Sequence, residues 1–122
     1  MKQEEVLQEF LNLEEMRQDF LNKKRARDAL WVAITIDKEP RNDTREIACK
    51  RAFYAYRYAK EIDKGPRDDT RIAACKRSKY AYYYATEVDK ELKDETWDAV
   101  KKTEWEEKYL AFFNAQTKEE II

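Results

Sequence analysis

A stretch of 26 residues occurs twice in succession in the middle of this chain. Residues 37–62 and 63–88 align without a gap, and 17 of the 26 aligned positions are identical. A third, diverged copy follows from Asp89, and a fainter copy precedes the pair. The positions retained by these flanking copies are Thr96, Lys102 and Ala111 on one side and Lys24, Ala29, Ala33 and Ile36 on the other. A unit this short cannot bury an apolar face alone, so successive units must stack against one another.

Residues that form turns are scarce in this chain. It contains one glycine, Gly65, and two prolines, Pro40 and Pro66, among 122 residues. A β structure needs frequent turns, whereas Ala, Lys, Glu and Arg favour helices. We therefore predict an all-α fold in which each unit is a pair of short helices, and the units form a small α-solenoid. The predicted single domain comprises N-terminal capping helices with a degenerate repeat (1–36), two full repeats (37–62 and 63–88), and a degenerate third repeat with a C-terminal cap (89–122).

Each repeat contains signals for where its helices begin and end. The column Asn42, Asp68 and Asp94 holds residues that favour the N-cap of a first helix. The second helix is expected over residues 53–63 and 79–89, with Ser78 as a cap and Gly65-Pro66 as a stop signal. The inner face of this helix follows helical spacing, and its members are Ala55, Tyr58, Ala59 and Ile62, then Ala81, Tyr84, Ala85 and Val88.

The terminal units differ in composition from the central pair, as the ends of a repeat array usually do. The N-terminal stretch carries apolar residues at helical spacing, namely Val6, Leu7, Phe10, Leu11, Leu13, Phe20 and Leu21. The C-terminal copy carries the large aromatic residues Trp97, Trp105, Phe112 and Phe113. We interpret both sets as parts of capping helices, with a docking surface as the alternative for the C-terminal aromatic residues.

The two central units carry the string DK-x-P-R-x-D-T-R-x-x-ACK followed by YAY-x-YA-x-E. This string resembles tandem repeats of uncharacterised bacterial and bacteriophage proteins, and the flanking copies depart from it. The paired-helix unit is also loosely similar in architecture to tetratricopeptide and Sel1-type repeats, which are longer. Neither resemblance implies an activity or a functional residue.

Several kinds of catalytic site are excluded by composition. The chain has no histidine, which removes the commonest general base and a principal zinc ligand, and a single glycine cannot build a phosphate-binding loop. We therefore predict a protein that is not an enzyme and that needs no cofactor or metal. Cys49 and Cys75 share one repeat position, so stacking places them too far apart for a disulfide, and we expect reduced, buried thiols.

Arginine and tyrosine recur at equivalent positions of the two central repeats. Both residue types are enriched in macromolecular interfaces because they combine a large contact area with a polar end. Salt bridges and packing between units are the alternative explanation for the same columns. The candidate binding residues are Arg41, Arg45, Arg51, Tyr54, Tyr56, Arg57, Arg67, Arg71, Arg77, Tyr80, Tyr82 and Tyr83.

We predict first that the chain binds another protein. One specific version of this prediction is a phage-type inhibitor or modulator of a host nucleic-acid-handling protein. Binding of RNA or single-stranded DNA is the first alternative, because Lys and Arg outnumber Asp and Glu by 13 to 9 in residues 37–88. Against it stand the net charge of −1 and the acidic C-terminal stretch. A self-assembling structural protein is the second alternative. With neither a signal peptide nor a membrane-length apolar run, we expect a cytoplasmic protein without membrane contact.

Overall fold

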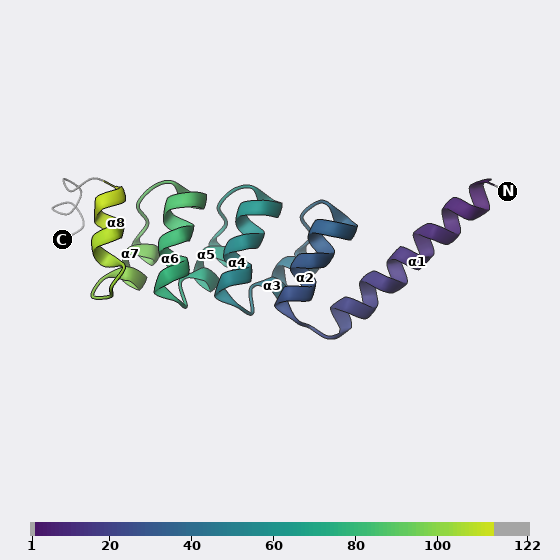
Figure 1. Cartoon of the computed structure of the whole chain (residues 1–122), viewed down its shortest axis with the longest axis horizontal. Helices are drawn as coiled ribbons and strands as arrows, with labels where there is room; N and C mark the ends of the chain where they lie inside the picture. Colours follow the sequence, from purple (N-terminus) through teal and green to yellow (C-terminus); the bar gives the residue numbers. More distant parts are fainter. Residues whose placement is uncertain (1, 114–122) are drawn as a thin grey trace.

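A computed structural model describes residues 2–113 and confirms the all-α class, with no strand in that range (Figure 1). A helix of 21 residues is followed by shorter helices, three of which continue directly into a π-helical turn. The elements in chain order are α1 (Lys2–Asn22), α2 (Ala26–Val32) with η1 (Ala33–Asp37), α3 (Asn42–Ala48), α4 (Ala52–Tyr58) with η2 (Ala59–Asp63), α5 (Asp68–Ala74), α6 (Ser78–Tyr83) with η3 (Tyr84–Asp89), α7 (Asp94–Val100) and α8 (Glu106–Phe112).

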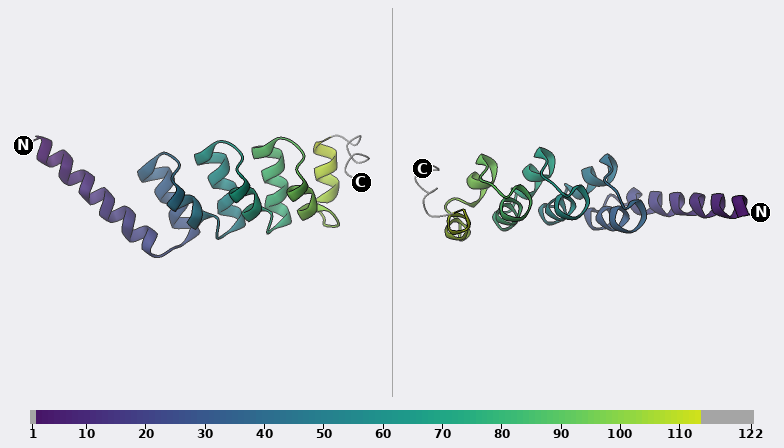
Figure 2. Two further views of the ribbon diagram at one scale, coloured as in Figure 1. Left: turned by 180° about the vertical axis from the view of Figure 1, so that it is seen from behind. Right: turned by 90° about the horizontal axis from the view of Figure 1, so that it is seen from above.

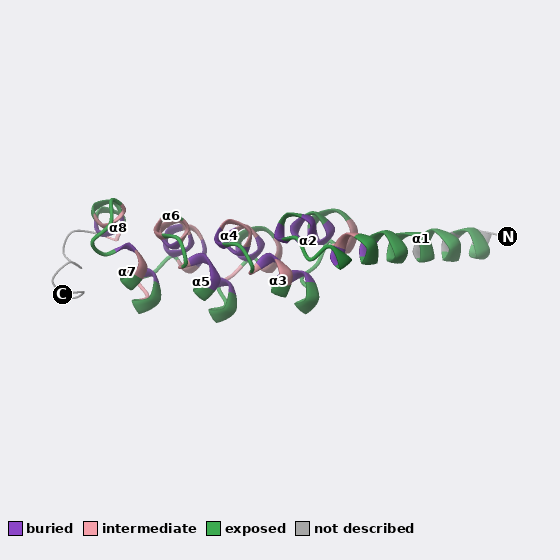
Figure 3. Cartoon of the chain, turned by 90° about the horizontal axis from the view of Figure 1, so that it is seen from below, coloured by how far each residue is buried: buried purple, intermediate pink, exposed green. Residues whose placement is uncertain are grey.

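The helices after α1 stand in two rows. α2, α4, α6 and α8 form one row, and the shorter α3, α5 and α7 form the other (Figure 3). Each central repeat supplies one short helix followed by one long helix, as predicted from the sequence. The observed long helices cover residues 52–63 and 78–89, one residue longer at the start than the predicted ranges.

Apolar packing joins each long helix to the short helix of the next unit, so α4 packs chiefly against α5 and α6 against α7. One core cluster combines Tyr56 of α4 and Ala59 of η2 with Ala74 of α5 and Tyr84 of η3. The predicted inner face is confirmed: Ala55, Tyr58, Ala59, Ala81, Tyr84 and Ala85 are fully buried, Val88 is buried and Ile62 is half-buried. Small alanine side chains allow this close approach of neighbouring helices.

The long helices end at a lysine in the left-handed conformation. Lys38, Lys64 and Lys90 have φ of 55°, 56° and 58°, and the amides of Lys38 and Lys90 bond to a carbonyl five residues earlier at 2.8 Å. The Gly65-Pro66 stop signal was predicted to place Gly65 directly after the helix, but Lys64 occupies that position. Gly65 has a negative φ, and the left-handed position falls on a lysine in every unit.

The short helices begin without the predicted side-chain caps. Arg41 and Arg67 occupy the N-cap positions of α3 and α5. Neither side chain caps the helix. The oxygens of Asn42 and Asp68 instead accept from the guanidinium groups of Arg45 and Arg71, each at 2.7 Å. Ser78, predicted to cap α6, lies inside that helix. Asp94, the third predicted cap, likewise lies inside α7, which has Lys93 at its N-cap.

The N-terminal helix α1 projects from the row and leaves much of its length without contacts (Figures 1 and 2). Leu21 is buried against Ala29 and Val32, and Phe20 packs beside them. The predicted capping role holds for these two residues. Other apolar residues predicted to cap the array are exposed (Leu7, Leu11 and Leu13), and the side chains of Val6 and Phe10 lie outside the described residues.

The third unit contains a one-residue shift between its two helices. Tyr109 takes the place of Tyr84, but it lies 13 residues after its hydrogen-bond partner Thr96, whereas Tyr84 lies 14 residues after Thr70. Ala111 is consequently exposed, and its predicted place in the alanine column is wrong. Of the predicted C-terminal caps, Trp97, Trp105 and Phe113 pack into the last core cluster, while Phe112 is 54% exposed. Residues 114–122 of the predicted cap lie outside the described range.

Candidate binding surface

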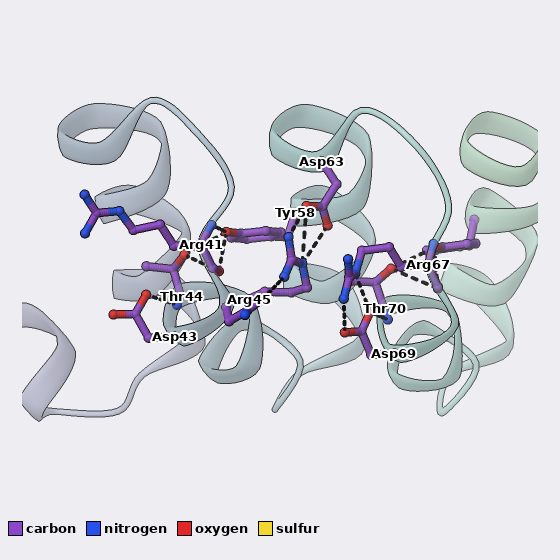
Figure 4. A network of polar contacts seen from close by, with 11 residues as sticks. Arg41, Asp43, Thr44, Arg45, Tyr58, Asp63, Arg67, Asp69 and Thr70 are labelled. Carbon is purple, nitrogen blue, oxygen red and sulfur yellow. Dashed lines mark hydrogen bonds and ion pairs between the residues drawn. The ribbon is translucent and has the colours of Figure 1, made fainter.

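Two of the predicted binding arginines are buried inside the repeat units. Arg45 Nε lies 3.0 Å from Asp63 Oδ2 (Figure 4). In the next repeat, Arg71 Nε lies 2.9 Å from Asp89 Oδ2. Both arginine side chains are at most 7% exposed, and each guanidinium also lies over a buried tyrosine ring. Hydrogen bonding to Asp89 raises the pKa of Arg71 above its usual range. These arginines join the short and long helices of one unit and present no free group to a partner.

The backbone N–H groups of Arg41 and Arg67 donate hydrogen bonds to the tyrosines at the ends of the same network. The backbone N–H of Arg41 donates to the Tyr58 hydroxyl at 3.0 Å, and Arg67 N–H donates to Tyr84 at 2.9 Å. Their side chains are partly exposed. The Arg67 guanidinium pairs with Asp69, which lowers the pKa of that carboxyl. The backbone of both residues is therefore structural, and each side chain lies at the surface beside a carboxylate.

Four of the predicted tyrosines, Tyr56, Tyr80, Tyr82 and Tyr83, gather on the row of long helices. We use the term aromatic face for Phe53, Tyr56, Tyr80, Tyr82, Tyr83 and Trp105. Neighbouring ring centroids within this set lie between 5.3 and 6.3 Å apart across α4, α6 and the start of α8. Tyr56 is buried and the other five are half-buried. The structure thus brings together predicted residues from both central repeats, and adds Phe53 and Trp105, which sequence reasoning assigned elsewhere or not at all.

The tyrosines of this face expose their polar ends. Within the described residues, the hydroxyls of Tyr80, Tyr82 and Tyr83 make no hydrogen bond, and they are not buried. Burial raises the pKa of Tyr56, helped by the neighbouring Glu87 carboxylate. Charged side chains surround the rings through two ion pairs, Arg57 with Glu61 and Lys60 with Glu87. Half-buried rings with a charged surround are the usual anatomy of a protein interface.

Three other predicted residues lie at the edge of this face. Arg51 and Arg77 occupy the tight turns that lead into α4 and α6, and Tyr54 lies beside them, with its ring centroid 4.9 Å from that of Phe53. Sequence reasoning grouped them with the other Arg and Tyr columns because helical position alone does not separate a turn from a buried face. The neighbouring lysines Lys50 and Lys76 recur in the sequence as well, and the Lys-Arg pair occurs at 24–25, 50–51 and 76–77.

The two cysteines are free and half-buried, so their predicted reduced state agrees with the structure and their predicted full burial does not. Burial raises the pKa of the Cys49 thiol to about 11 and that of Cys75 to about 12. A thiol that stays protonated at neutral pH is a poor nucleophile. The chemistry of both positions is therefore that of small, inert packing residues.

Comparisons with protein-family models, curated proteins and solved structures found no match to this chain. In residues 2–113, no cluster of three or more His, Cys, Asp or Glu side chains has the arrangement to hold a metal ion. No described helix is both long and apolar enough to cross a membrane. The fold defines an all-α protein of repeated helix pairs. Its function is inferred from the surfaces of these helices.

Proposed function

We propose that this chain is a non-enzymatic protein-binding module, that its row of helix pairs is a small α-solenoid, and that the aromatic face is its contact surface. The observation that carries the proposal is the cluster of half-buried rings across α4, α6 and the start of α8, in which the hydroxyls of Tyr80, Tyr82 and Tyr83 have no hydrogen-bond partner among the described residues. Tyrosine offers a large contact area and loses few rotamers on binding. Rings already fixed by their neighbours would bind a partner with little further loss of entropy.

Charged residues at the border of the aromatic face support this use. Arg57 lies 5.8 Å from the Phe53 ring centroid, and its ion pair with Glu61 is partly exposed. A border of this kind adds specificity more than affinity, because exposed ion pairs contribute little free energy. The resemblance to bacteriophage repeats gives the proposal a concrete form, a small inhibitor or modulator of a host nucleic-acid-handling protein.

Affinity capture with a matched pair of variants tests the proposal. The tagged chain is incubated with a nuclease-treated bacterial lysate, alongside Tyr83→Ala and the control Ile72→Ala. Ile72 is 58% exposed on α5, in the other row of helices, so its loss leaves the aromatic face intact. We expect one protein in near-equal amount with the wild type and Ile72→Ala, and its loss with Tyr83→Ala. Equal capture by all three, or no specific partner, would count against the aromatic face.

Self-assembly is a second candidate, and α1 is the observation that favours it. Leu7, Leu11, Leu13 and Met16 are each at least 43% exposed on a helix that projects from the array. Exposed apolar side chains clustered on one segment commonly mark an interaction site. Light scattering over a range of protein concentrations distinguishes the candidates, because self-assembly raises the apparent mass with concentration and binding of another protein does not.

A further inference from the structure

A row of unpaired cations follows one edge of the array. We use the term basic edge for Lys24, Arg25, Arg27, Lys50, Arg51, Lys76 and Arg77. They lie at the start of α2 and in the turns before α4 and α6, along the lower border of the array in Figure 1. All seven are exposed, and within residues 2–113 none of them forms an ion pair. This distinguishes them from Arg17, Arg45 and Arg71, whose guanidinium groups bind buried carboxylates.

Two grooves run between these turns and share their central residues. One, of about 400 Å³, lies between the turns before α4 and α6, and the other, of about 410 Å³, lies between the turns before α2 and α4. Lys50, Arg51 and Tyr54 line both grooves, so the two form a continuous track. No aspartate or glutamate is among the described residues that line either groove. Like charges gathered without counterions repel one another, and an anionic ligand relieves that repulsion.

Aromatic rings lie within the same track. Phe53, Tyr54 and Tyr80 line the first groove, and Tyr54 continues into the second. The Tyr54 hydroxyl makes no hydrogen bond within the described residues. Cations that bind phosphates, beside planar rings on which bases stack, are the combination that proteins use to bind single-stranded nucleic acid. A groove of a few hundred Å³ is in the size range of small-ligand sites.

We infer that the basic edge binds single-stranded nucleic acid, with Lys50, Arg51, Lys76 and Arg77 on the phosphates and Tyr54 and Tyr80 against the bases. The rings favour this ligand over an acidic polypeptide, whose carboxylates would use the cations and leave the rings without a stacking partner. A membrane surface is disfavoured because the strongly exposed apolar residues, including Leu7, Ile72 and Phe112, lie on helices away from these turns. Phe53 and Tyr80 line the first groove and also belong to the aromatic face, so the two sites adjoin. The cations of the basic edge and Tyr54 lie outside the aromatic face as defined, and variants at those positions test this inference alone.

Fluorescence anisotropy with labelled 20-nucleotide oligo-dT and oligo-U tests the inference, and the two probes distinguish DNA from RNA. For a single strand, the logarithm of the affinity should fall with the logarithm of salt concentration by about 0.7 per phosphate contact. The Lys50→Ala/Arg51→Ala double variant should bind at least tenfold more weakly and with a shallower salt slope. The control Lys93→Ala/Lys101→Ala removes the same charge from partly exposed lysines on either side of α7, outside both grooves, and should bind as the wild type does.

Tyr54 provides the test of stacking. Tyr54→Phe keeps the ring and should retain affinity, whereas Tyr54→Leu should lose roughly tenfold, as expected for one stacked base. Circular dichroism and thermal unfolding establish that each variant folds. Equal weakening by both double variants, or affinity that does not change with salt, would overturn the inference. Competition by poly-glutamate as effective as by oligo-dT, with no effect of Tyr54→Leu, would assign the edge to an acidic polypeptide instead.

Discussion

The hydroxyl of Tyr84 lies 2.9 Å from the backbone nitrogen of Arg67, 17 residues earlier in the chain. The same hydroxyl donates to the Arg67 carbonyl at 3.0 Å and lies 2.7 Å from Thr70 Oγ1. One phenol thus satisfies three polar atoms at the start of α5. Tyr58 makes the same three contacts at the start of α3. The short helices are therefore fastened at their first turn by a tyrosine from the following long helix.

Removing this hydroxyl should destabilise the protein. Tyr84→Phe keeps the buried ring but leaves the Arg67 amide without its partner, while the Thr70 hydroxyl retains only its bond to the Arg67 carbonyl, at a cost of about 1–3 kcal/mol. Urea unfolding followed by circular dichroism measures the change. The control is Tyr83→Phe, whose hydroxyl has no hydrogen-bond partner among the described residues, and it should cost under about 0.5 kcal/mol. Similar losses for both variants would show that the hydrogen bonds do not hold the helix start.

Buried carboxylates of the repeats should contribute more to the free energy of unfolding than exposed carboxylates that bind the same arginine. Asp89 is fully buried and Asp68 is 88% exposed, and both contact Arg71. Asp89→Asn leaves a buried cation with a neutral partner and should cost up to about 3 kcal/mol. Asp68→Asn should change the free energy of unfolding by less than about 0.5 kcal/mol, because water replaces the lost contact. Equal effects in a thermal unfolding experiment would contradict the assigned roles.

The sequence predicts the helices and the buried face well because both depend on local spacing. Ala55, Tyr58 and Ala59 recur at the intervals of one helical face, and their repetition 26 residues later leaves a single register for stacking. The faint first copy was also recognised from the sequence, and the structure agrees with it. Ala29 and Ala33 are fully buried, as are Ala55 and Ala59. These features need no knowledge of contacts between distant residues.

Other features depend on contacts that repeat spacing does not contain. Asp37 corresponds to Asp63 and Asp89, but its arginine partner comes from α1 and lies 20 residues away, whereas the partners of the other two lie 18 residues away. At the far end, Trp97 stands where Arg71 would recur and packs on Tyr109, with centroids 5.8 Å apart. In each terminal unit, the residue that takes the arginine's place in the polar network differs in type or in position. An alignment of the repeats records such a change only as a mismatch.

The ion pair of Arg17 predicts how α1 is attached to the array. Arg17 Nε lies 2.8 Å from the buried Asp37 carboxylate, and its Nη2 lies 2.8 Å from Asp43. Arg17→Ala should release the last turns of α1 and leave Asp37 buried without its cation. Limited trypsin digestion should then cut several-fold faster at the Lys23-Lys24-Arg25 junction. The exposed neighbour Gln18, changed to Ala, serves as the control, and an unchanged cleavage rate for Arg17→Ala would contradict this attachment.

The cysteines make a prediction about reactivity and its dependence on pH. With pKa values of about 11 for Cys49 and about 12 for Cys75, few thiolates exist in the folded protein at pH 8.5. Compared with an unstructured cysteine, whose pKa is near 8.5, alkylation by iodoacetamide should therefore be on the order of 100-fold slower at Cys49 and on the order of 1,000-fold slower at Cys75. Because the folded pKa values are raised, their contribution to stability is complete below about pH 8.5. It should be lost progressively as pH rises from there through about 11 and 12.

Alkylation of the native and urea-unfolded protein at one pH separates burial from intrinsic reactivity. Both cysteines should react rapidly in urea and slowly without it, and mass spectrometry of tryptic peptides assigns the rate to each position. Cys75 should be the slower of the two, since burial raises its pKa further. Cys49→Ala should leave the rate at Cys75 unchanged, because the two thiols form no disulfide. Native rates equal to those in urea would mean that neither thiol is protected by packing between the units.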